Sequence, residues 1–270
     1  MFNSSNLEVV RLTHAVIDAH IHLDMYEAAD RARILDDLEM YNIEALISVS
    51  NHLASAHKNL ELSKTYPAIK PAFGFHPEQH LPPTEELTAI LSFINNHHHH
   101  MVAIGEVGLP YYLRRDNPSI PIEPYIEWLE VFIKQARTLN KPVILHAIFE
   151  DAPVVCDLLE KHSLHQVHFH WFKGDDRTIE RLINNGYYIS ITPDVVYEEE
   201  IQQIVHMYPL SLMMVETDGP WPFKGPYKND LTHPKMIHHT IKKIAQIKRQ
   251  NEMDVYRLLY ENTRNFYNLN

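Results

Sequence analysis

Cysteine and glycine are scarce in this sequence, and each shortage excludes a class of structure. The 270 residues hold one cysteine, Cys156, so no disulfide framework can form within the chain. There are 7 glycines and none before Gly74, so no glycine-rich phosphate turn follows the first predicted strand. The sequence contains no run of about 18 apolar residues, so it predicts no membrane span. The first six residues lack the order of a signal peptide, so we expect a cytoplasmic protein.

Negative charge exceeds positive charge, with 24 Lys and Arg against 35 Asp and Glu and a net charge of −11. This balance argues against a broad surface that coats nucleic acid, but it allows a local metal or phosphate site. Apolar residues make up 45% of the chain, which is enough to repay the entropy of folding. The unusual abundance is 20 histidines. Because histidine is the commonest metal ligand, the placement of these residues matters most.

Short apolar runs rich in β-branched residues recur along the chain and predict eight strands. The predicted strands are Ala15–Ile21, Ala45–Ser50, Ile69–Phe75, Met101–Val107, Pro142–His146, Gln166–His170, Tyr187–Ile191 and Leu212–Glu216. Helical patterns occupy most of the gaps, as at Ala28–Tyr41, Ile122–Leu139 and Thr178–Asn185. Eight strand–helix units predict a (β/α)₈ TIM barrel of the α/β class, in one domain over residues 1–270. The competing fold, a doubly wound open sheet, would need the missing glycine-rich turn.

Histidine pairs and carboxylates stand at the ends of several predicted strands. His20 and His22 are two residues apart on one strand, so both imidazoles point to the same side and can share a cation. Such a pair also occurs as two structural histidines. Glu106 follows an apolar run, where a carboxylate can bridge two metals or, alternatively, cap a helix or pair with a cation.

The later strands end in the same kinds of residue. His146 closes the fifth predicted strand, and His168 and His170 share a face of the sixth. We favour His170 because it lies nearer the carboxyl end of its strand. Asp218 follows the eighth strand, although an Asp before Gly is often only a turn former. Each residue alone has an ordinary structural explanation, but five strand ends of this kind on the catalytic face of a barrel predict a metal site.

The number of these residues predicts two metal ions. Nitrogen and oxygen ligands suit Zn²⁺, Mn²⁺, Fe²⁺ or Ni²⁺, and six ligands exceed the needs of one tetrahedral ion. Two ions about 3.5–4 Å apart can hold a bridging hydroxide and polarise a scissile bond. Asp218 would bind one ion and accept the proton of the attacking water. The predicted ligands are His20, His22, Glu106, His146, His170 and Asp218.

Six motifs in this order resemble the TatD family of metal-dependent hydrolases, within the amidohydrolase-like barrels. The motifs are His20-Ile21-His22-Leu23-Asp24, Gly74-Phe75-His76-Pro77, Ala103-Ile104-Gly105-Glu106-Val107-Gly108-Leu109, Pro142-Val143-Ile144-Leu145-His146, His170-Trp171-Phe172-Lys173-Gly174 and Glu216-Thr217-Asp218-Gly219-Pro220. The segment from Glu261 to Phe266 is similar to the closing helix of the family, so the resemblance covers nearly the whole chain.

The resemblance implies a role for each residue. One divalent ion would be held by His20, His22 and Asp218, the second by His146 and His170, with Glu106 bridging the two ions and His76 facing the substrate. Several members of the family are magnesium- or manganese-dependent DNases that act on single strands as 3′–5′ exonucleases. The implied cofactors are therefore two divalent ions, of Zn, Mn, Mg, Fe or Ni, and the implied partner is a nucleic-acid end.

The sequence departs from the family pattern in two places. Pro110 stands where the family usually has Asp, and Ala147-Ile148 stands where a small residue and an Arg usually follow the histidine. An Arg is a natural bidentate clamp for phosphate, so its absence weakens the nuclease interpretation. Arg114, Arg115 and Lys173 could compensate, or they could be solvated surface charges. The aromatic residues that could stack bases, or instead pack over the mouth, are Tyr111, Tyr112, Trp171 and Trp221.

Three functions remain open at the level of sequence. The leading hypothesis is a two-metal hydrolase that cleaves phosphodiester bonds at DNA ends, with Asp218 and Glu106 as its catalytic residues. The second keeps the same site but changes the substrate to a small amide, lactone or phosphate ester. The third is a barrel that binds metal or a partner without turnover, which the complete ligand set and general base disfavour.

Overall fold

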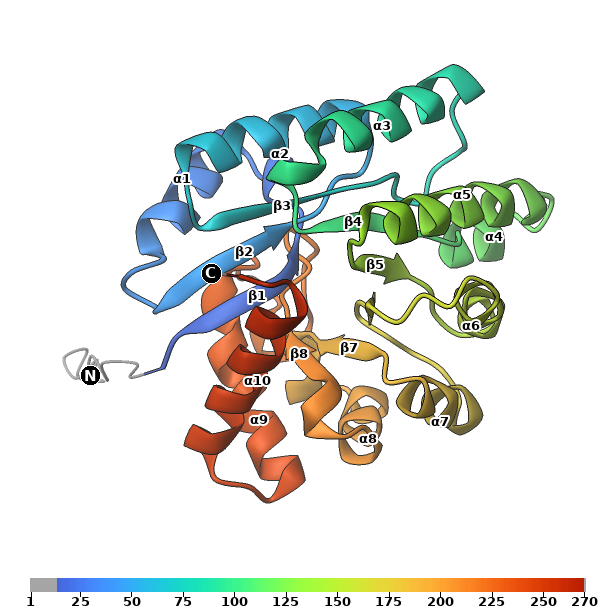
Figure 1. Ribbon diagram of the computed structural model, residues 1–270. Coiled ribbons are helices and arrows are strands. Elements are labelled where there is room, and N and C mark those ends of the chain that lie inside the picture. The colour runs from blue at the N-terminus through green and yellow to red at the C-terminus, as the bar shows by residue number, and fades with distance from the viewer. Residues whose placement is uncertain (1–13, 270) are drawn as a thin grey trace.

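Eight parallel strands form one sheet in the order β1-β2-β3-β4-β5-β6-β7-β8 in the computed structural model, which describes residues 14–269 (Figure 1). The strands are β1 (Val16–Ile21), β2 (Ile43–Ser48), β3 (Ile69–Phe73), β4 (Ala103–Gly108), β5 (Val143–His146), β6 (Val167–Phe169), β7 (Tyr188–Ile191) and β8 (Met213–Val215). Each strand pairs in parallel with the next one along the chain.

The helices surround this central sheet in Figure 1. They are α1 (Ala28–Asp37), α2 (Leu53–Thr65), α3 (Thr84–His97), α4 (Tyr111–Asp116), α5 (Glu123–Leu139), α6 (Asp151–Lys161), α7 (Asp176–Asn184), α8 (Glu199–Met207), α9 (Ile237–Lys248) and α10 (Glu252–Phe266). The predicted TIM barrel is confirmed. Cys156 lies buried in α6, and among the described residues no helix has the length and apolarity needed to cross a membrane.

Backbone hydrogen bonds just beyond the last strand bring its end against the first strand. The Asp218 N–H donates to the His20 carbonyl at 2.9 Å, and the His22 N–H donates to the Gly219 carbonyl at 2.7 Å. These bonds join the segment after β8 to the end of β1. The two ends of the sheet therefore meet at the mouth of the barrel, where the carboxyl ends of parallel strands lie together.

Alternation along the strands divides the apolar residues into two cores. On β4, Ala103 belongs to the core inside the barrel, whereas its neighbour Ile104 packs in the layer between the sheet and the helices. On β5, Ile144 faces inward and Leu145 faces the helix layer. The inner core also contains the C-terminal residues Phe266, Tyr267 and Leu269. This C-terminal segment lies near β1 in Figure 1 and fills the inside of the barrel opposite the mouth.

The predicted ends of several elements are wrong by a few residues. The helix expected over Ala28–Tyr41 ends at Asp37, because the chain must turn into β2: the Ile43 N–H donates to the Leu38 carbonyl at 2.9 Å. The second predicted strand begins at Ile43 instead of Ala45. At the mouth, His170 and Glu216 lie just past the ends of β6 and β8, where the chain leaves the sheet.

Candidate metal centre

The six predicted metal ligands come together at one end of the barrel, as the parallel topology requires. Each is buried, with an exposed fraction of 8% or less. They lie on or directly after five strands: His20 and His22 at β1, Glu106 on β4, His146 on β5, His170 after β6 and Asp218 after β8.

Glu106 lies at the centre of this cluster, and its two carboxylate oxygens face different histidines. Oε1 lies 2.6 Å from His170 Nε2 and 3.1 Å from His146 Nδ1. Oε2 lies 3.3 Å from the Nε2 atoms of both His20 and His22. One carboxylate thus faces two separate pairs of imidazoles, which is the arrangement a bridging ligand requires.

Asp218 completes one of the two groups. Its Oδ1 lies 3.3 Å from His20 Nε2 and 3.4 Å from His22 Nε2. The backbone of Asp218 is left-handed, with φ of 50°, a conformation that Asp tolerates better than most residues. This bend directs the side chain back toward β1 immediately after β8 ends.

Polar atoms in the cluster lack the hydrogen bonds that buried groups normally make. Both oxygens of Glu106 and Oδ1 of Asp218 are buried and accept no hydrogen bond from any described residue. His146 Nδ1 and His170 Nε2 approach to 3.2 Å, and the two Nε2 atoms of His20 and His22 approach to 3.4 Å. Converging lone pairs of this kind fit divalent cations. Potential ligand atoms lie within 4.8 Å of one another in the groups His20–His22–Asp218 and Glu106–His146–His170.

The electrostatics of the cluster favour bound positive charge. Burial alone would raise the pKa of Glu106, but the imidazoles around it, His170 foremost, hold that pKa well below its usual range. Contacts with His20 and His22 likewise outweigh burial and lower the pKa of Asp218. Burial opposes the charge of His22, yet Asp218 and Glu106 raise its pKa to about 9. Two ionised carboxylates therefore attract either protons or metal ions to these imidazoles.

His76, the residue expected to face the substrate, lies at the edge of the cluster. Its Nε2 is 3.6 Å from Glu106 Oε2, and its Nδ1 accepts the Glu78 N–H at 3.1 Å. Burial and the neighbouring histidines lower the pKa of His76 to about 4, although Glu106 raises it. His76 also forms a possible ligand group with His22 and Glu106. Its imidazole is therefore neutral at pH 7 and lines the cavity beside the predicted ligands.

A cavity of about 520 Å³ opens above the cluster, and its floor includes His146, His170 and Asp218. Much of its wall is apolar or aromatic, formed by Tyr112, Leu113, Ile148, Trp171, Trp221 and Pro222, and His76, Glu78 and Asp116 complete the lining. Three of the four aromatic residues expected at the mouth therefore line the cavity. The fourth, Tyr111, packs instead against the rings of Tyr112 and Phe149.

The three basic residues expected to compensate for the missing Arg do not line this cavity. Arg114 lies 3.5 Å from the buried carboxylate of Asp151. Arg115 pairs with Asp116 at 3.0 Å. The Lys173 amino group lies over the ring of Trp171, 5.1 Å from its centroid. Asp116 and Trp171 line the cavity, but the cations beside them do not, so the charged and titratable groups of the lining are histidines and carboxylates.

Residues 17–268 match the protein family described as TatD related DNase. The chain belongs to this family. The TatD-family assignment made from the sequence motifs is confirmed, and it makes the protein an enzyme of the metal-dependent hydrolase class, as expected.

Named relatives agree with the TatD assignment. An uncharacterized metal-dependent hydrolase of Haemophilus influenzae is 36% identical over 94% of this chain and 100% of its own length. The human protein named deoxyribonuclease TATDN3 is 31% identical over 86% of this chain and 87% of its own. The crystal structure of YJJV, a TatD homolog from Escherichia coli, superposes with a TM-score of 0.83 at 23% identity, over 94% of this chain and 98% of that one. This structural likeness supports the shared barrel fold.

Three carboxylates near the cluster of predicted ligands, the partly buried Glu78 and the buried Glu216 and Asp18, have no role predicted from the sequence. Glu78 contacts His146 at 3.0 Å. Glu216 accepts the Trp171 N–H at 2.7 Å and lies 3.7 Å from His170 Nδ1, with which it forms another possible ligand group. The signal that the sequence offered for these carboxylates was position, because each stands two residues from His76, Asp218 or His20.

The third carboxylate is Asp18, which lies two residues before His20, the first of the predicted ligands. It accepts the Thr217 N–H at 3.0 Å and also the Thr217 hydroxyl. Burial raises the pKa of Asp18 to about 8, despite these hydrogen bonds. Asp18 therefore links β1 to the segment that carries Asp218.

His168 does not join the cluster, although it shares a predicted strand face with His170. Its Nδ1 lies 2.6 Å from the Tyr267 hydroxyl, and its Nε2 lies 2.5 Å from the Ser190 hydroxyl. Both nitrogens thus have partners inside the barrel, nearer the C-terminal segment. The preference for His170 at the mouth agrees with this geometry.

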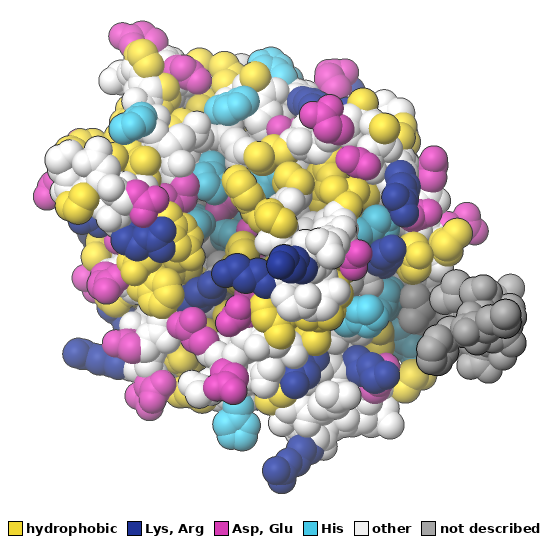
Figure 2. All heavy atoms as spheres, turned by 180° about the vertical axis from the view of Figure 1, so that it is seen from behind, with side chains coloured by type: hydrophobic (Ala, Val, Ile, Leu, Met, Phe, Trp, Pro, Cys, Tyr) yellow, Lys and Arg dark blue, Asp and Glu magenta, His cyan; other side chains and the backbone are white. Residues whose placement is uncertain are grey.

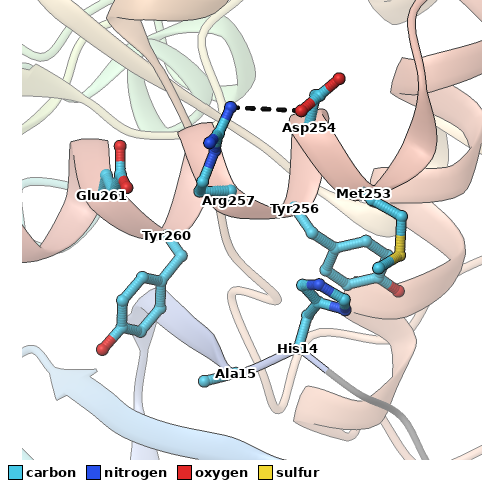
Figure 3. A pocket seen from close by; sticks show the side chains of 8 residues that line it. All are labelled: His14, Ala15, Met253, Asp254, Tyr256, Arg257, Tyr260 and Glu261. Atoms are coloured by element: carbon cyan, nitrogen blue, oxygen red, sulfur yellow. Dashed lines mark hydrogen bonds and ion pairs between the residues drawn. The ribbon is translucent and has the colours of Figure 1, made fainter.

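A second hollow of about 480 Å³ lies on the outside of the TatD-family barrel, against α10 (Figure 3). Its lining includes His14, Ala15, Tyr256 and Tyr260. Arg257, which also lines it, pairs with Asp254 at 3.2 Å (Figure 3). No metal-ligand group of the described residues lies there. Figure 2 shows acidic and basic side chains interspersed over one face of the molecule, without a broad basic patch.

Proposed function

We propose that this TatD-family hydrolase uses two divalent metal ions to cleave phosphodiester bonds at the ends of DNA. The whole chain, residues 1–270, would act as a single barrel. The observation that carries the proposal is the placement of Glu106, whose two oxygens face two different pairs of histidines. The buried atoms of Glu106 and Asp218 that accept no hydrogen bond support the same conclusion, because bound cations would satisfy them.

The ligand groups follow the distances. His20, His22 and Asp218 would hold one ion, His146 and His170 the other, and Glu106 would be shared. The ions, of Zn, Mn, Mg, Fe or Ni, would polarise the scissile bond and make a water molecule more acidic. No thiolate takes part, because burial raises the pKa of Cys156 to about 12 and the residue lies in α6.

Asp218 is suited to act as the general base. Its carboxylate is ionised, buried and directed into the floor of the cavity. It would take the proton of the water that attacks phosphorus, while the bond from phosphorus to the leaving oxygen breaks. The neutral imidazole of His76 can contact a phosphate oxygen from the side of the cavity. Trp171, Trp221 and Tyr112 can stack against a terminal base.

DNA is proposed as the substrate because the family description and the human relative are both named for deoxyribonuclease activity. An end-labelled single-stranded oligonucleotide tests it, with metal-stripped protein reloaded with Mg²⁺, Mn²⁺ or Zn²⁺. We expect metal-dependent shortening from the 3′ end, and none with Asp218→Asn. Two bound ions per chain without cleavage would reject the nuclease activity while retaining the metal centre.

A small ester, lactone, amide or phosphate ester is the second candidate substrate. The observation in its favour is that apolar and aromatic side chains form much of the cavity wall, while no Lys or Arg lines the cavity. Such a wall suits a neutral group of limited size better than a polyanion. A panel of chromogenic esters, lactones and phosphodiesters, assayed with the same reloaded protein, separates the two candidates. Turnover of neutral esters above that of phosphodiesters would favour the small substrate.

A further inference from the structure

Glu78 is a carboxylate that connects the candidate metal centre to a wall of the cavity. It follows β3 and His76, and its side chain is 13% exposed. One oxygen, Oε1, lies 3.0 Å from His146 Nε2 and accepts the Tyr112 N–H at 2.8 Å. The other oxygen, Oε2, accepts the Leu113 N–H at 2.7 Å. Three donors therefore converge on one carboxylate.

The contact with His146 determines which ring nitrogen is free to bind metal. Nδ1 of His146 faces Glu106 Oε1 at 3.1 Å and His170 Nε2 at 3.2 Å, so it points into the proposed second metal group. Nε2 points the opposite way, toward Glu78. A carboxylate that accepts the Nε2 proton leaves the Nδ1 lone pair available and fixes the plane of the ring.

The other two hydrogen bonds position the cavity wall. Tyr112 and Leu113 lie in the first turn of α4, where backbone N–H groups have no partner inside the helix. Glu78 accepts both of these N–H groups, and the side chains of both residues line the cavity. Among the described residues, no Lys or Arg forms an ion pair with Glu78. The hydrogen-bond partners of Glu78 are thus the predicted ligand His146 and the backbone of Tyr112 and Leu113 in the cavity wall.

We infer that Glu78 is a positioning residue that holds His146 with Nδ1 directed at the second metal ion and seats α4 beside that ion. This inference rests on the proposed two-metal centre. It predicts that Glu78 governs the affinity of one ion, the one held by Glu106, His146 and His170, and leaves the other ion unaffected. Its carboxylate itself stays outside the ligand groups.

Zinc titration of metal-stripped protein, followed by calorimetry, tests this inference without an activity assay. For wild type we expect two Zn²⁺ ions. Glu78→Ala should lower the affinity for one of these ions about 10–100-fold, which is the usual effect of removing a carboxylate that holds a histidine ligand. The affinity for the other ion should not change. Glu78→Gln should lower the affinity for the same ion by a smaller factor. Its amide oxygen can still accept a hydrogen bond from His146, but its NH₂ group cannot accept the Leu113 N–H.

Asp116→Asn is the matched control. Asp116 lines the same cavity on α4, and its carboxylate pairs with the exposed Arg115. This substitution removes the same charge as Glu78→Gln, but from a residue that does not contact His146. Both zinc affinities should therefore equal those of wild type. Equal losses in Asp116→Asn and Glu78→Gln would mean that charge alone matters, and would overturn the inference.

The remaining outcomes separate this inference from the proposed function. A wild type that binds no Zn²⁺ would refute the metal centre itself. Two ions in wild type with unchanged affinities in both Glu78 variants would refute only the positioning role. A lower unfolding temperature with unchanged zinc affinities would show that Glu78 merely caps α4. Should Glu78→Ala fail to fold, the affinity of Glu78→Gln decides, and an unchanged value overturns the inference.

Discussion

Gly108 on β4 pairs directly with His146 on β5, and the two backbones lie in contact. The neighbouring Leu109 N–H donates to the His146 carbonyl at 3.0 Å. A Cβ atom on residue 108 would collide with that carbonyl oxygen, which belongs to the backbone and cannot rotate away. Only because residue 108 has no side chain can the backbone of the proposed ligand His146 lie this close to β4.

Gly108→Ala should displace His146 and weaken zinc binding at one of the two proposed ions. Overpacking of this kind also lowers the free energy of unfolding, by about 1–3 kcal/mol. Calorimetric zinc titration and chemical denaturation measure the two effects. The control is Gly186→Ala, where φ is +69° but no atom lies within 4 Å of the added Cβ. It should cost about 1 kcal/mol of stability and leave zinc binding intact. Equal zinc affinity in both variants would contradict the argument.

Asp218→Asn should lower kcat by about 100-fold or more while the protein still binds metal. The amide keeps one ligand oxygen for the ion but can no longer take a proton from water, and general base catalysis typically contributes this much. Parallel measurement of kcat and bound metal separates the two roles. Glu106→Ala, which removes the shared carboxylate, should instead lose both metal and activity. Full activity in either variant would refute the site.

Removal of metal should lower the unfolding temperature. Six buried ligand residues converge without enough hydrogen bonds, so ions that bind only the folded state stabilise it, by about 2.7 kcal/mol at 100 times the dissociation constant. Thermal unfolding with and without a chelator measures the difference, which corresponds to several degrees. The variant His20→Ala/His22→Ala should respond less to the chelator. If the unfolding temperature of wild type were the same with and without the chelator, tightly bound ions would be excluded.

Asp151 should make stability fall as pH rises from about 4 to 6. Burial raises the pKa of this carboxyl to about 6, although Arg114 at 3.5 Å opposes the change. The native protein therefore keeps a proton that the unfolded chain releases near pH 4, so the free energy of unfolding falls as the pH rises from about 4 to about 6. Asp151→Asn should stabilise the protein at pH 8 but not at pH 4.

Chemical denaturation at the two pH values tests this dependence on Asp151. The exposed Asp36 on α1 provides a control, because Asp36→Asn removes the same charge from a solvated site. Its unfolding free energy should match wild type at both pH values. A stabilisation by Asp151→Asn that is the same at pH 4 and pH 8 would show that the carboxyl does not change its protonation between them.

The sequence alone was sufficient to predict the fold and the set of residues that converge. Apolar runs separated by helical patterns identified the eight strands, because burial imposes a period that survives in the sequence. The spacing of His20 and His22 follows from the geometry of one strand. Their meeting with Glu106, His146, His170 and Asp218 follows from topology, since the carboxyl ends of all strands in a parallel barrel lie at one mouth.

Only the tertiary structure decided what surrounds those residues. His168 shares a strand face with His170, but it bonds to Tyr267, 99 residues away in the chain. The turn of Arg114 toward Asp151, away from the cavity, depends on how α4 packs beside α6. Glu78 approaches His146 from a loop 68 residues earlier. Such contacts depend on the register of strands and the packing of helices, which join distant segments and leave no periodic signal in the sequence.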